Sequence, residues 1–127
     1  ENPATFFVAE FIGTPQMNFI NGKIKSNNFI SEGFNCSLNS NINDQNVIFG
    51  IRPENLKVSP QGNIQMKVDL IEKLGADSII YGYDKSNNYI CYRENGNTNI
   101  KVNNEITLEI EEGKYHLFDK ETKKRLN

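Results

Sequence analysis

The sequence has little of what metal sites, disulfide frameworks and nucleophilic catalysis require. Its 127 residues include two cysteines and one histidine. Cys36 and Cys91 lie far apart, with no C-x-x-C pattern and no neighbouring histidine, so we expect two small buried hydrophobes in a reduced, cytosolic protein. His116 has no second histidine or cysteine with which to hold zinc. The sequence therefore predicts a structural imidazole that bonds a backbone carbonyl.

Long apolar runs and concentrated positive charge are also lacking. No stretch is long and apolar enough to span a bilayer, and the N-terminal residues lack the pattern of a signal peptide. The net charge is −2, and the basic run at 120–125 is interrupted by Glu121. A nucleic-acid or anionic membrane surface would need clustered lysine and arginine. We therefore expect no nucleic-acid partner.

A phosphate loop is absent as well. The Gly-Lys pairs at 22–23 and 113–114 are followed by isoleucine and tyrosine, not by the hydroxyl residue that the G-x-x-x-x-G-K-[ST] loop requires. No Leu-Ser-Gly-Gly-Gln signature occurs, and the carboxylates of Glu109 and Glu111 fall on one solvated strand face. We therefore predict no catalytic residue, no metal site and no cofactor site in this chain.

What the sequence does contain is mainly strand and turn signals. Strands are predicted at 18–25, 29–31, 34–38, 47–51, 64–73, 78–83, 89–92, 99–102, 105–110 and 115–118. Hairpin turns are expected at Glu32-Gly33 and at Asn95-Gly96, and a longer loop at 84–88. Ten short strands joined by such turns predict an all-β, closed or semi-closed barrel.

The N-terminal residues predict one short helix. Asn2 is suited to cap it, Pro3 to begin it, and Gly13 to end it. Its apolar residues occupy more than one stripe, so it should be buried on more than one side. They are the candidate domain-interface residues Phe6, Phe7, Val8, Phe11 and Ile12.

Three short motifs follow one another in a fixed order. They are F-I-G-T-P-Q-M-N-F at 11–19, G-I-R-P-E at 50–54 and H-L-F-D at 116–119. Together they resemble the C-terminal regulatory domain of the ATP-binding subunits of ABC-type sugar importers, the maltose-transporter ATPase family. The resemblance covers essentially the whole chain. It marks Gly50, Arg52, Pro53, Glu54, His116, Phe118 and Asp119 as structural motif residues.

The resemblance implies an OB-like, partly open β-barrel of the MOP/TOBE type with a short N-terminal helix. Residues 1–16 would be a helical linker from a missing ATPase domain, and residues 17–127 the regulatory barrel. ATP and Mg²⁺ would bind in the missing domain. The implied partners are that domain, a second copy of the subunit, the membrane permease subunits and a regulatory protein. The implied location is cytoplasmic, peripheral on the inner face of the cell membrane.

Local chemistry around the motifs leads to further expectations. Arg52 and Glu54 should form an ion pair that clamps the strand end, with a charged site involving Glu72 or Asp77 as the alternative. Asp119 should cap the turn through 120–122. The family usually has glycine where Lys123 stands, so the sequence does not predict how tight that turn is.

Two other functions compete with the regulatory reading. The same barrel family includes molybdate- and tungstate-binding modules, although a compact nest of Ser, Thr and Lys donors is missing here. The tyrosines 81, 83, 89 and 92, with Lys85 and Arg93, also resemble a base-stacking platform for single-stranded nucleic acid. Tyrosines that fill the barrel wall and present their hydroxyls outward are the simpler interpretation.

Overall fold

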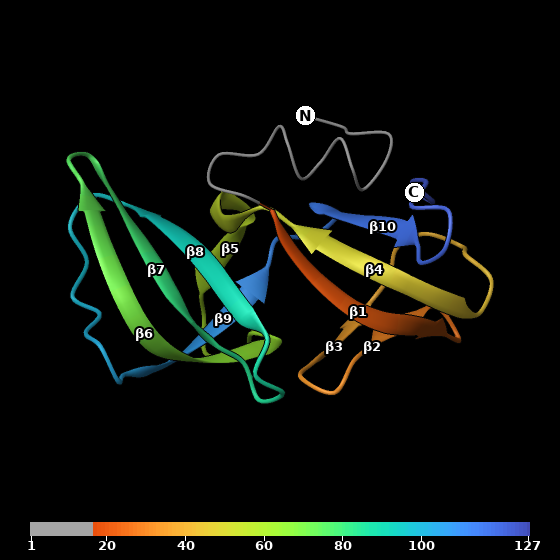
Figure 1. Ribbon diagram of the computed structural model, residues 1–127, viewed down its shortest axis with the longest axis horizontal. Helices are drawn as coiled ribbons and strands as arrows, with labels where there is room; N and C mark the ends of the chain where they lie inside the picture. The colour runs from red at the N-terminus through yellow and green to blue at the C-terminus, as the bar shows by residue number, and fades with distance from the viewer. Residues whose placement is uncertain (1–16) are drawn as a thin grey trace.

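The computed structural model describes residues 17–127, and Figure 1 shows two antiparallel sheets side by side along the long axis. The strands are β1 (Asn18–Lys25), β2 (Asn28–Ile30), β3 (Asn35–Ser37), β4 (Gln45–Ile51), β5 (Leu56–Val58), β6 (Ile64–Leu74), β7 (Asp77–Tyr83), β8 (Tyr89–Asn95), β9 (Glu105–Ile110) and β10 (Tyr115–Asp119). Within the described residues the helical content is one 3₁₀ turn, η1 (Pro53–Asn55). No helix in this part of the chain is long and apolar enough to cross a membrane.

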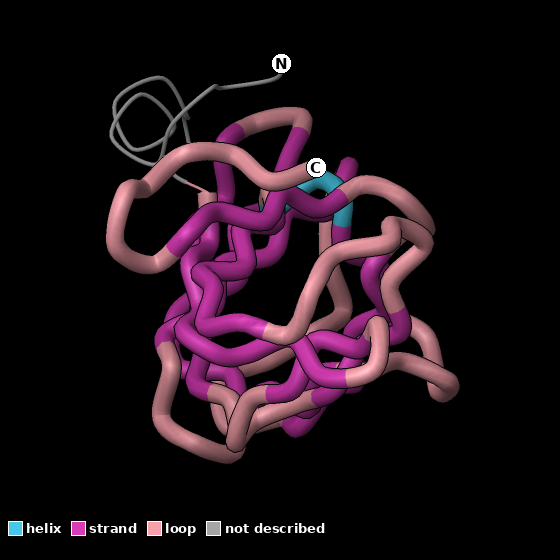
Figure 2. Tube along the Cα trace, turned by 90° about the vertical axis from the view of Figure 1, so that its right-hand side faces the viewer, coloured by secondary structure: helices cyan, strands magenta, loops and turns pink. Residues whose placement is uncertain are grey.

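The two sheets have five strands each and do not join into one closed barrel. The first sheet has the order β10-β4-β1-β2-β3, and the second has the order β5-β9-β6-β7-β8. β10 comes last in the chain but pairs with β4, so the first sheet is completed by residues from both halves of the sequence. The end-on view of Figure 2 shows the strands arranged around a common interior. The all-β, partly open prediction is confirmed.

Alternation of apolar and polar residues explains the strands. In β6 the side chains of Ile64, Met66 and Val68 are buried, while the residues between them are exposed. The register then shifts between Val68 and Leu70, so one residue is left over. This bulge turns Leu70 to the outside, where it is 47% exposed, although simple alternation places it on the buried face with Met66.

One main core lies between the two sheets. It includes Phe29, Phe49 and Tyr115 of the first sheet and Phe34 of the β2–β3 turn, whose neighbouring ring centroids lie 4.7 to 5.6 Å apart. The second sheet contributes Ile64, Met66, Val68, Ile80, Ile90 and Leu108. A smaller cluster of Met17, Ile48 and Phe118, with Phe19 packed against it, forms apart from this core.

One predicted strand is wrong and one strand was missed. Residues 99–102 form a loop, because side chains satisfy its backbone: Ile100 N donates to Thr98 Oγ1 at 3.0 Å and Lys101 N to Asn104 Oδ1 at 2.9 Å. The missed strand is β5, which pairs with the end of β9, Leu56 opposite Ile110. Its three residues carry no alternation long enough to be seen in the sequence.

The predicted hairpin at Asn95-Gly96 is also wrong. Gly96 does adopt the left-handed conformation, with φ +77°. Its amide, however, donates to Ala76 O, and so closes the end of the β7–β8 pair. The chain then crosses to β9, which pairs with β5 and β6, so β8 has no hairpin partner after it.

The other two turn predictions are confirmed. Glu32 and Gly33 form the turn between β2 and β3, closed by a Ser31 N to Phe34 O bond of 3.0 Å. The 84–88 loop is organised by the Asp84 carboxylate, which accepts from Ser86 N and Asn88 N, each at 2.9 Å. A Cβ on Gly33 would lie 2.3 Å from Asp84 Oδ2, so glycine lets this loop of the second sheet touch the first sheet.

Candidate functional site

The sequence motifs come together on three neighbouring strands. β4 lies between β1 and β10, and Gly50 of β4 is paired with Phe19 on one side and His116 on the other. The segments 17–19, 50–54 and 116–119 are therefore adjacent in space, although up to about a hundred residues separate them in the chain. This pairing is the physical reason why the three motifs occur together.

The motif residues cover the side of the first sheet that faces away from the main core. Ile51 and Leu117 point into the core, so alternation directs Gly50, His116 and Phe118 to the opposite side. We call this side the motif face, defined by Met17, Phe19, Ile48, Gly50, His116 and Phe118.

Gly50 lies at the centre of the motif face, where neighbouring side chains leave no room for a larger residue. A Cβ there would lie 2.7 Å from Met17 Sδ and 3.2 Å from Phe118 Cε2. Phe19 and Phe118 meet edge to face across it, with ring centroids 6.2 Å apart. Phe118 is fully buried and Ile48 is 4% exposed, so the motif face is withdrawn from solvent.

The Arg-Pro-Glu segment forms the crossing between the sheets. β4 ends at Ile51, as the proline predicted, and Pro53 begins the 3₁₀ turn that leads into β5. Asn55 N donates to Arg52 O at 2.9 Å, and Pro53 is buried. Residues 52–55 thus form a short, hydrogen-bonded connection from the first sheet to the second.

Asn18 ties the sheets together, a role that the sequence analysis did not assign. Its side chain is 5% exposed. Its Nδ2 donates to Ile51 O at 3.1 Å and Cys91 O at 2.9 Å, and its Oδ1 accepts from Cys91 N at 2.7 Å. The amide therefore supplies β8 with the bonds that a neighbouring strand would give. Its place inside the M-N-F motif was the available signal.

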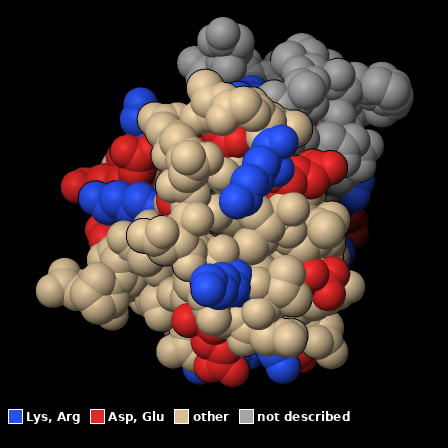
Figure 3. All heavy atoms as spheres, turned by 90° about the vertical axis from the view of Figure 1, so that its left-hand side faces the viewer, with Lys and Arg blue, Asp and Glu red and all other residues tan. Residues whose placement is uncertain are grey.

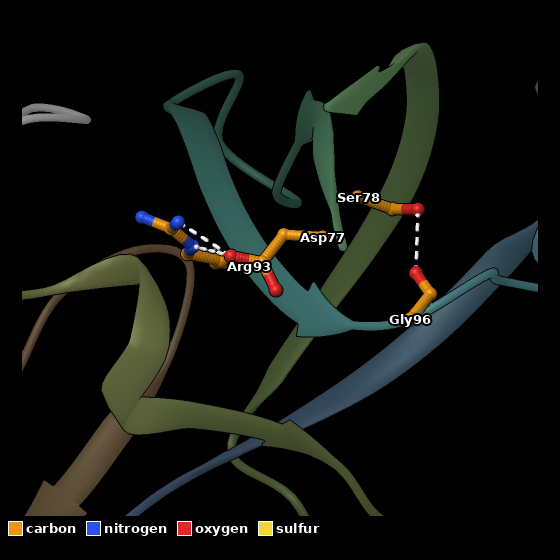
Figure 4. A network of polar contacts seen from close by, with 4 residues as sticks. All are labelled: Asp77, Ser78, Arg93 and Gly96. Carbon is orange, nitrogen blue, oxygen red and sulfur yellow. Dashed lines mark hydrogen bonds and ion pairs between the residues drawn. The ribbon is translucent and has the colours of Figure 1, made fainter. Parts of the chain in front are cut away.

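The ion pair predicted for Arg52 and Glu54 is wrong. The ion pair in the described part of the chain joins Arg93 of β8 and Asp77 of β7, with Nε and Nη2 at 2.9 and 2.5 Å from Oδ2 (Figure 4). Glu54 is exposed and lines an open hollow of about 500 Å³ beside this pair. Arg52 instead lies with Nη2 buried and without a hydrogen-bond partner among the described residues.

Figure 4 also shows how the pair is positioned. Asp77 is the first residue of β7, and the next residue, Ser78, donates its hydroxyl to Gly96 O at 3.0 Å. Both side-chain contacts therefore hold the same end of the β7–β8 ladder, where β7 begins and β8 ends. The alternative charged site with Glu72 does not form, because Glu72 Oε1 accepts from the Tyr81 hydroxyl at 3.0 Å.

His116 differs from its prediction. It is 7% exposed, and its Nδ1 has no hydrogen-bond partner in the described part of the chain, so the expected bond to a backbone carbonyl is not made by this atom. The pKa of His116 is lowered to about 4, mainly by burial and then by the positive charges of Arg125 and Arg52. The imidazole is neutral at pH 7.

Asp119 caps the last turn as predicted. Its Oδ1 accepts from Thr122 N and Glu121 N, each at 2.9 Å, and these bonds lower the pKa of the carboxyl group. Lys123 takes the left-handed conformation, with φ +65°, that glycine adopts more easily. The turn therefore keeps its shape without glycine, at a cost of about 1 kcal/mol.

The remaining candidate residues separate into buried and solvent-facing groups. Cys36 and Cys91 are buried free thiols, and burial raises the pKa of both, that of Cys91 to about 12. Tyr81 and Tyr89 stack at 5.8 Å on the outside of the second sheet. No group of three His, Cys, Asp or Glu able to hold a metal occurs within residues 17–127. Phe6, Phe7, Val8, Phe11 and Ile12, with the predicted helix, lie outside the described residues.

The surface at the end of the second sheet carries charges of both signs. Figure 3 shows lysine and arginine side chains among aspartate and glutamate on this face, without a broad basic stripe. A groove that follows a nucleic-acid backbone needs such a stripe. This face therefore lacks the electrostatic part of a single-strand binding surface.

The fold and the motif face define a small β-domain of OB-like type. Its main structural features are the contacts that connect its two sheets. The chain belongs to the TOBE domain family, whose profile matches residues 49–118. The profile of the MalK OB fold domain matches residues 13–56. The two matches together include every residue that defines the motif face.

Curated relatives extend the comparison along the chain. The sn-glycerol-3-phosphate import ATP-binding protein UgpC of Escherichia coli K12 is 32% identical over 134 residues, covering 99% of this chain and 37% of the relative. Its namesake from Vibrio cholerae is 33% identical, covering 96% and 35%. That from Psychromonas ingrahamii is 30% identical, covering 99% and 36%. The chain thus spans about a third of the length of these relatives.

Proposed function

We propose that this chain is the C-terminal regulatory and dimerisation domain of the ATP-binding subunit of an ABC-type importer of carbohydrates or glycerol phosphates. The family membership and the import ATP-binding proteins among the relatives support the proposal. The longer protein would couple ATP hydrolysis to uptake. Residues 1–16 would link the ATPase domain to the barrel of residues 17–127.

The observation that carries the proposal is the assembly of the three motifs on β1, β4 and β10. The chain enters this face directly, because Met17 belongs to the apolar cluster of the motif face. Met17 and Phe118 leave no room for a Cβ at Gly50, and Asn18 binds the same corner to the second sheet. A domain that transmits the position of a preceding domain needs a stiff corner of this kind at its entrance.

The domain itself would contribute no catalytic group. ATP and Mg²⁺ would bind in the ATPase domain, since no phosphate loop occurs in this sequence. The domain would act by binding one state of the ATPase dimer better than another, which shifts the populations without entering the chemical step.

The partners follow from that role. A second copy of the subunit would meet this domain across a two-fold axis, and a regulatory protein would bind its exposed surface. The permease subunits would be reached through the ATPase domain. The whole subunit would be cytoplasmic and peripheral on the inner face of the membrane.

The test is the longer subunit with and without residues 17–127. We expect the truncated subunit to bind ATP and keep its basal hydrolysis, and to lose its response to a regulator. ATPase rates would be measured with and without the regulatory partner, after circular dichroism has shown that both proteins are folded. A folded truncated subunit that binds ATP normally but does not hydrolyse it at any concentration would disprove the proposal.

A further inference from the structure

The chain has three arginines, and their guanidinium groups differ in hydrogen bonding. Arg93 donates two hydrogen bonds to Asp77. Arg52 has its Nη2 buried without a hydrogen-bond partner within residues 17–127, and Arg125 has its Nε in the same condition. A buried donor of a charged group that lacks a partner is costly, so two such donors at one place call for an explanation.

These two arginines lie on either side of His116. Arg52 directly follows Ile51, which is paired with Tyr115, the residue before His116. Arg125 is opposite Phe118, two residues after His116. Alternation directs His116 and Phe118 to the same side of the sheet. Gly50 is paired with His116, so alternation directs Arg52 to this side as well. The positive charges of both arginines lower the pKa of His116.

His116 adds a third donor position. The residue is buried, with 7% of its surface exposed, and its Nδ1 has no hydrogen-bond partner in the described part of the chain. A neutral imidazole has one N–H, which Nδ1 is able to carry. The three groups therefore come from the end of β4, from β10 and from the C-terminal segment.

The C-terminal segment is held firmly, so Arg125 is not a loose side chain on a free end. Leu126 N donates to Leu117 O at 2.7 Å, and Asp119 N donates to Lys124 O at 2.8 Å. Leu117 N donates in turn to Asn127 Oδ1 at 2.8 Å. The segment thus runs back beside β10, joined to it by an isolated β-bridge between Arg125 and Phe118.

Acidic residues nearby in the sequence are used elsewhere. Asp119 Oδ1 accepts from the backbone of its own turn. Glu54 lines the hollow that also contains Arg93. Within residues 17–127 the ion pair that forms is that of Arg93, and Arg52 and Arg125 have none.

We propose that Arg52, His116 and Arg125 form a receptor for an oxyanion, a phosphate or a carboxylate group. Guanidinium groups donate in a planar fork that matches both anions, and such charge-assisted bonds are the strong ones. Arg52 and Arg125 each keep part of their surface exposed, so an anion can approach from solvent. The bound anion would satisfy the buried donors and offset two neighbouring positive charges.

Two sources can supply the same chemistry. One is a free anion such as inorganic phosphate. The other is a carboxylate of this chain, for which Glu10 is suited because it lies seven residues before Met17 of the motif face. The site is the same in both cases, and the experiment separates the sources.

The experiment uses His116 as its reporter, because it is the single histidine of the sequence. The imidazole resonances would be followed by NMR over a pH titration, in chloride and in phosphate at equal ionic strength. The charged groups of the described residues that act on this imidazole are Arg125 and Arg52. A bound anion opposes them, so we expect phosphate to raise the pKa of His116.

Matched variants assign the response. Arg125→Gln and Arg52→Gln should each weaken the phosphate effect about tenfold or more, as loss of a charge-assisted hydrogen bond does. Arg93→Gln should leave it unchanged, because that guanidinium is occupied by Asp77. If Arg52→Gln does not fold, Arg125→Gln alone decides.

The outcomes are distinct. A phosphate response in the wild-type chain supports a receptor for a free anion. A response that is seen only in Glu10→Gln supports a receptor already filled by the chain's own carboxylate. No response in either protein, or an equal loss in Arg93→Gln and Arg125→Gln, would overturn the proposal.

Discussion

The outer faces of the two sheets are built on opposite plans. On the motif face of the first sheet, Met17 and Ile48 are 4% exposed and Phe118 is fully buried. On the outside of the second sheet, Leu70, Tyr83 and Tyr89 are 43 to 48% exposed. We call the second surface the tyrosine face, defined by Leu70, Tyr81, Tyr83 and Tyr89.

Polar groups follow the same division. Around the motif face, Arg52, His116 and Arg125 each have a buried atom without a hydrogen-bond partner in the described part of the chain. On the tyrosine face, Tyr81 donates to Glu72, and beside it Arg93 is bound to Asp77. Buried polar atoms therefore lack partners around the first sheet, while the polar side chains on the second sheet bind one another.

The largest effect should come from Asn18→Ala. The change leaves Cys91 N, Cys91 O and Ile51 O without their side-chain partner in a buried place, and we expect a loss of about 3 kcal/mol in the free energy of unfolding. Urea denaturation followed by circular dichroism measures it. The control is Asn21→Ala, an exposed position on the same strand. A loss for Asn18→Ala no greater than for the control would show that the amide does not join the sheets.

The next effect should be a pH dependence that originates at the motif face. His116 has a pKa of about 4 when folded and 6.5 when exposed, so below pH 6.5 the unfolded chain binds a proton that the folded chain does not. The stability contributed above pH 6.5 should be lost as the pH falls toward 4, by roughly 2 to 3 kcal/mol.

The comparison protein for this pH test is His116→Gln. Carboxyl groups such as Asp119 titrate in both proteins, so the difference between the two curves isolates the imidazole. Denaturant midpoints would be measured from pH 7.5 to about 4.5, with the window set by the two pKa values. Parallel curves for the two proteins would mean that His116 is exposed enough to titrate normally.

The smallest effect should come from the second sheet. Arg93→Gln removes the ion pair with Asp77, whose side chains keep 32% and 20% of their surface exposed. Exposed pairs contribute little, so we expect about 0.5 to 1 kcal/mol. The same denaturation assay measures it, with addition of salt as a second check, since screening should reduce the wild-type advantage. A loss as large as that of Asn18→Ala would remove the contrast between the sheets.

Much of the secondary structure could be predicted from local pattern. β1 was predicted with the bounds that the structure has, and β6 and β9 differ by at most one residue. The turn at Glu32-Gly33 and the cap of Asp119 also followed from local chemistry. These features depend on alternation and on side chains within a few residues, and both can be read from a single segment.

The candidate site was predictable only in part. The ordered motifs identified Gly50, Arg52, Pro53 and the 116–119 segment, and the family match followed the same residues. The partners of those residues were predicted incorrectly, because Arg52 was assigned to Glu54 and His116 to a carbonyl. Which groups meet depends on strand order, and β10 joins β4 across more than sixty residues of sequence.

The sequence by itself determined the strand periodicity, the turn chemistry and the family of this protein. The tertiary structure decided that 56–58 pairs while 99–102 does not, that Gly96 closes one hairpin without opening another, and that Asn18 reaches β8. The physical reason is that a backbone group must find a partner wherever it is buried, and the choice of partner belongs to the segments that packing brings beside it.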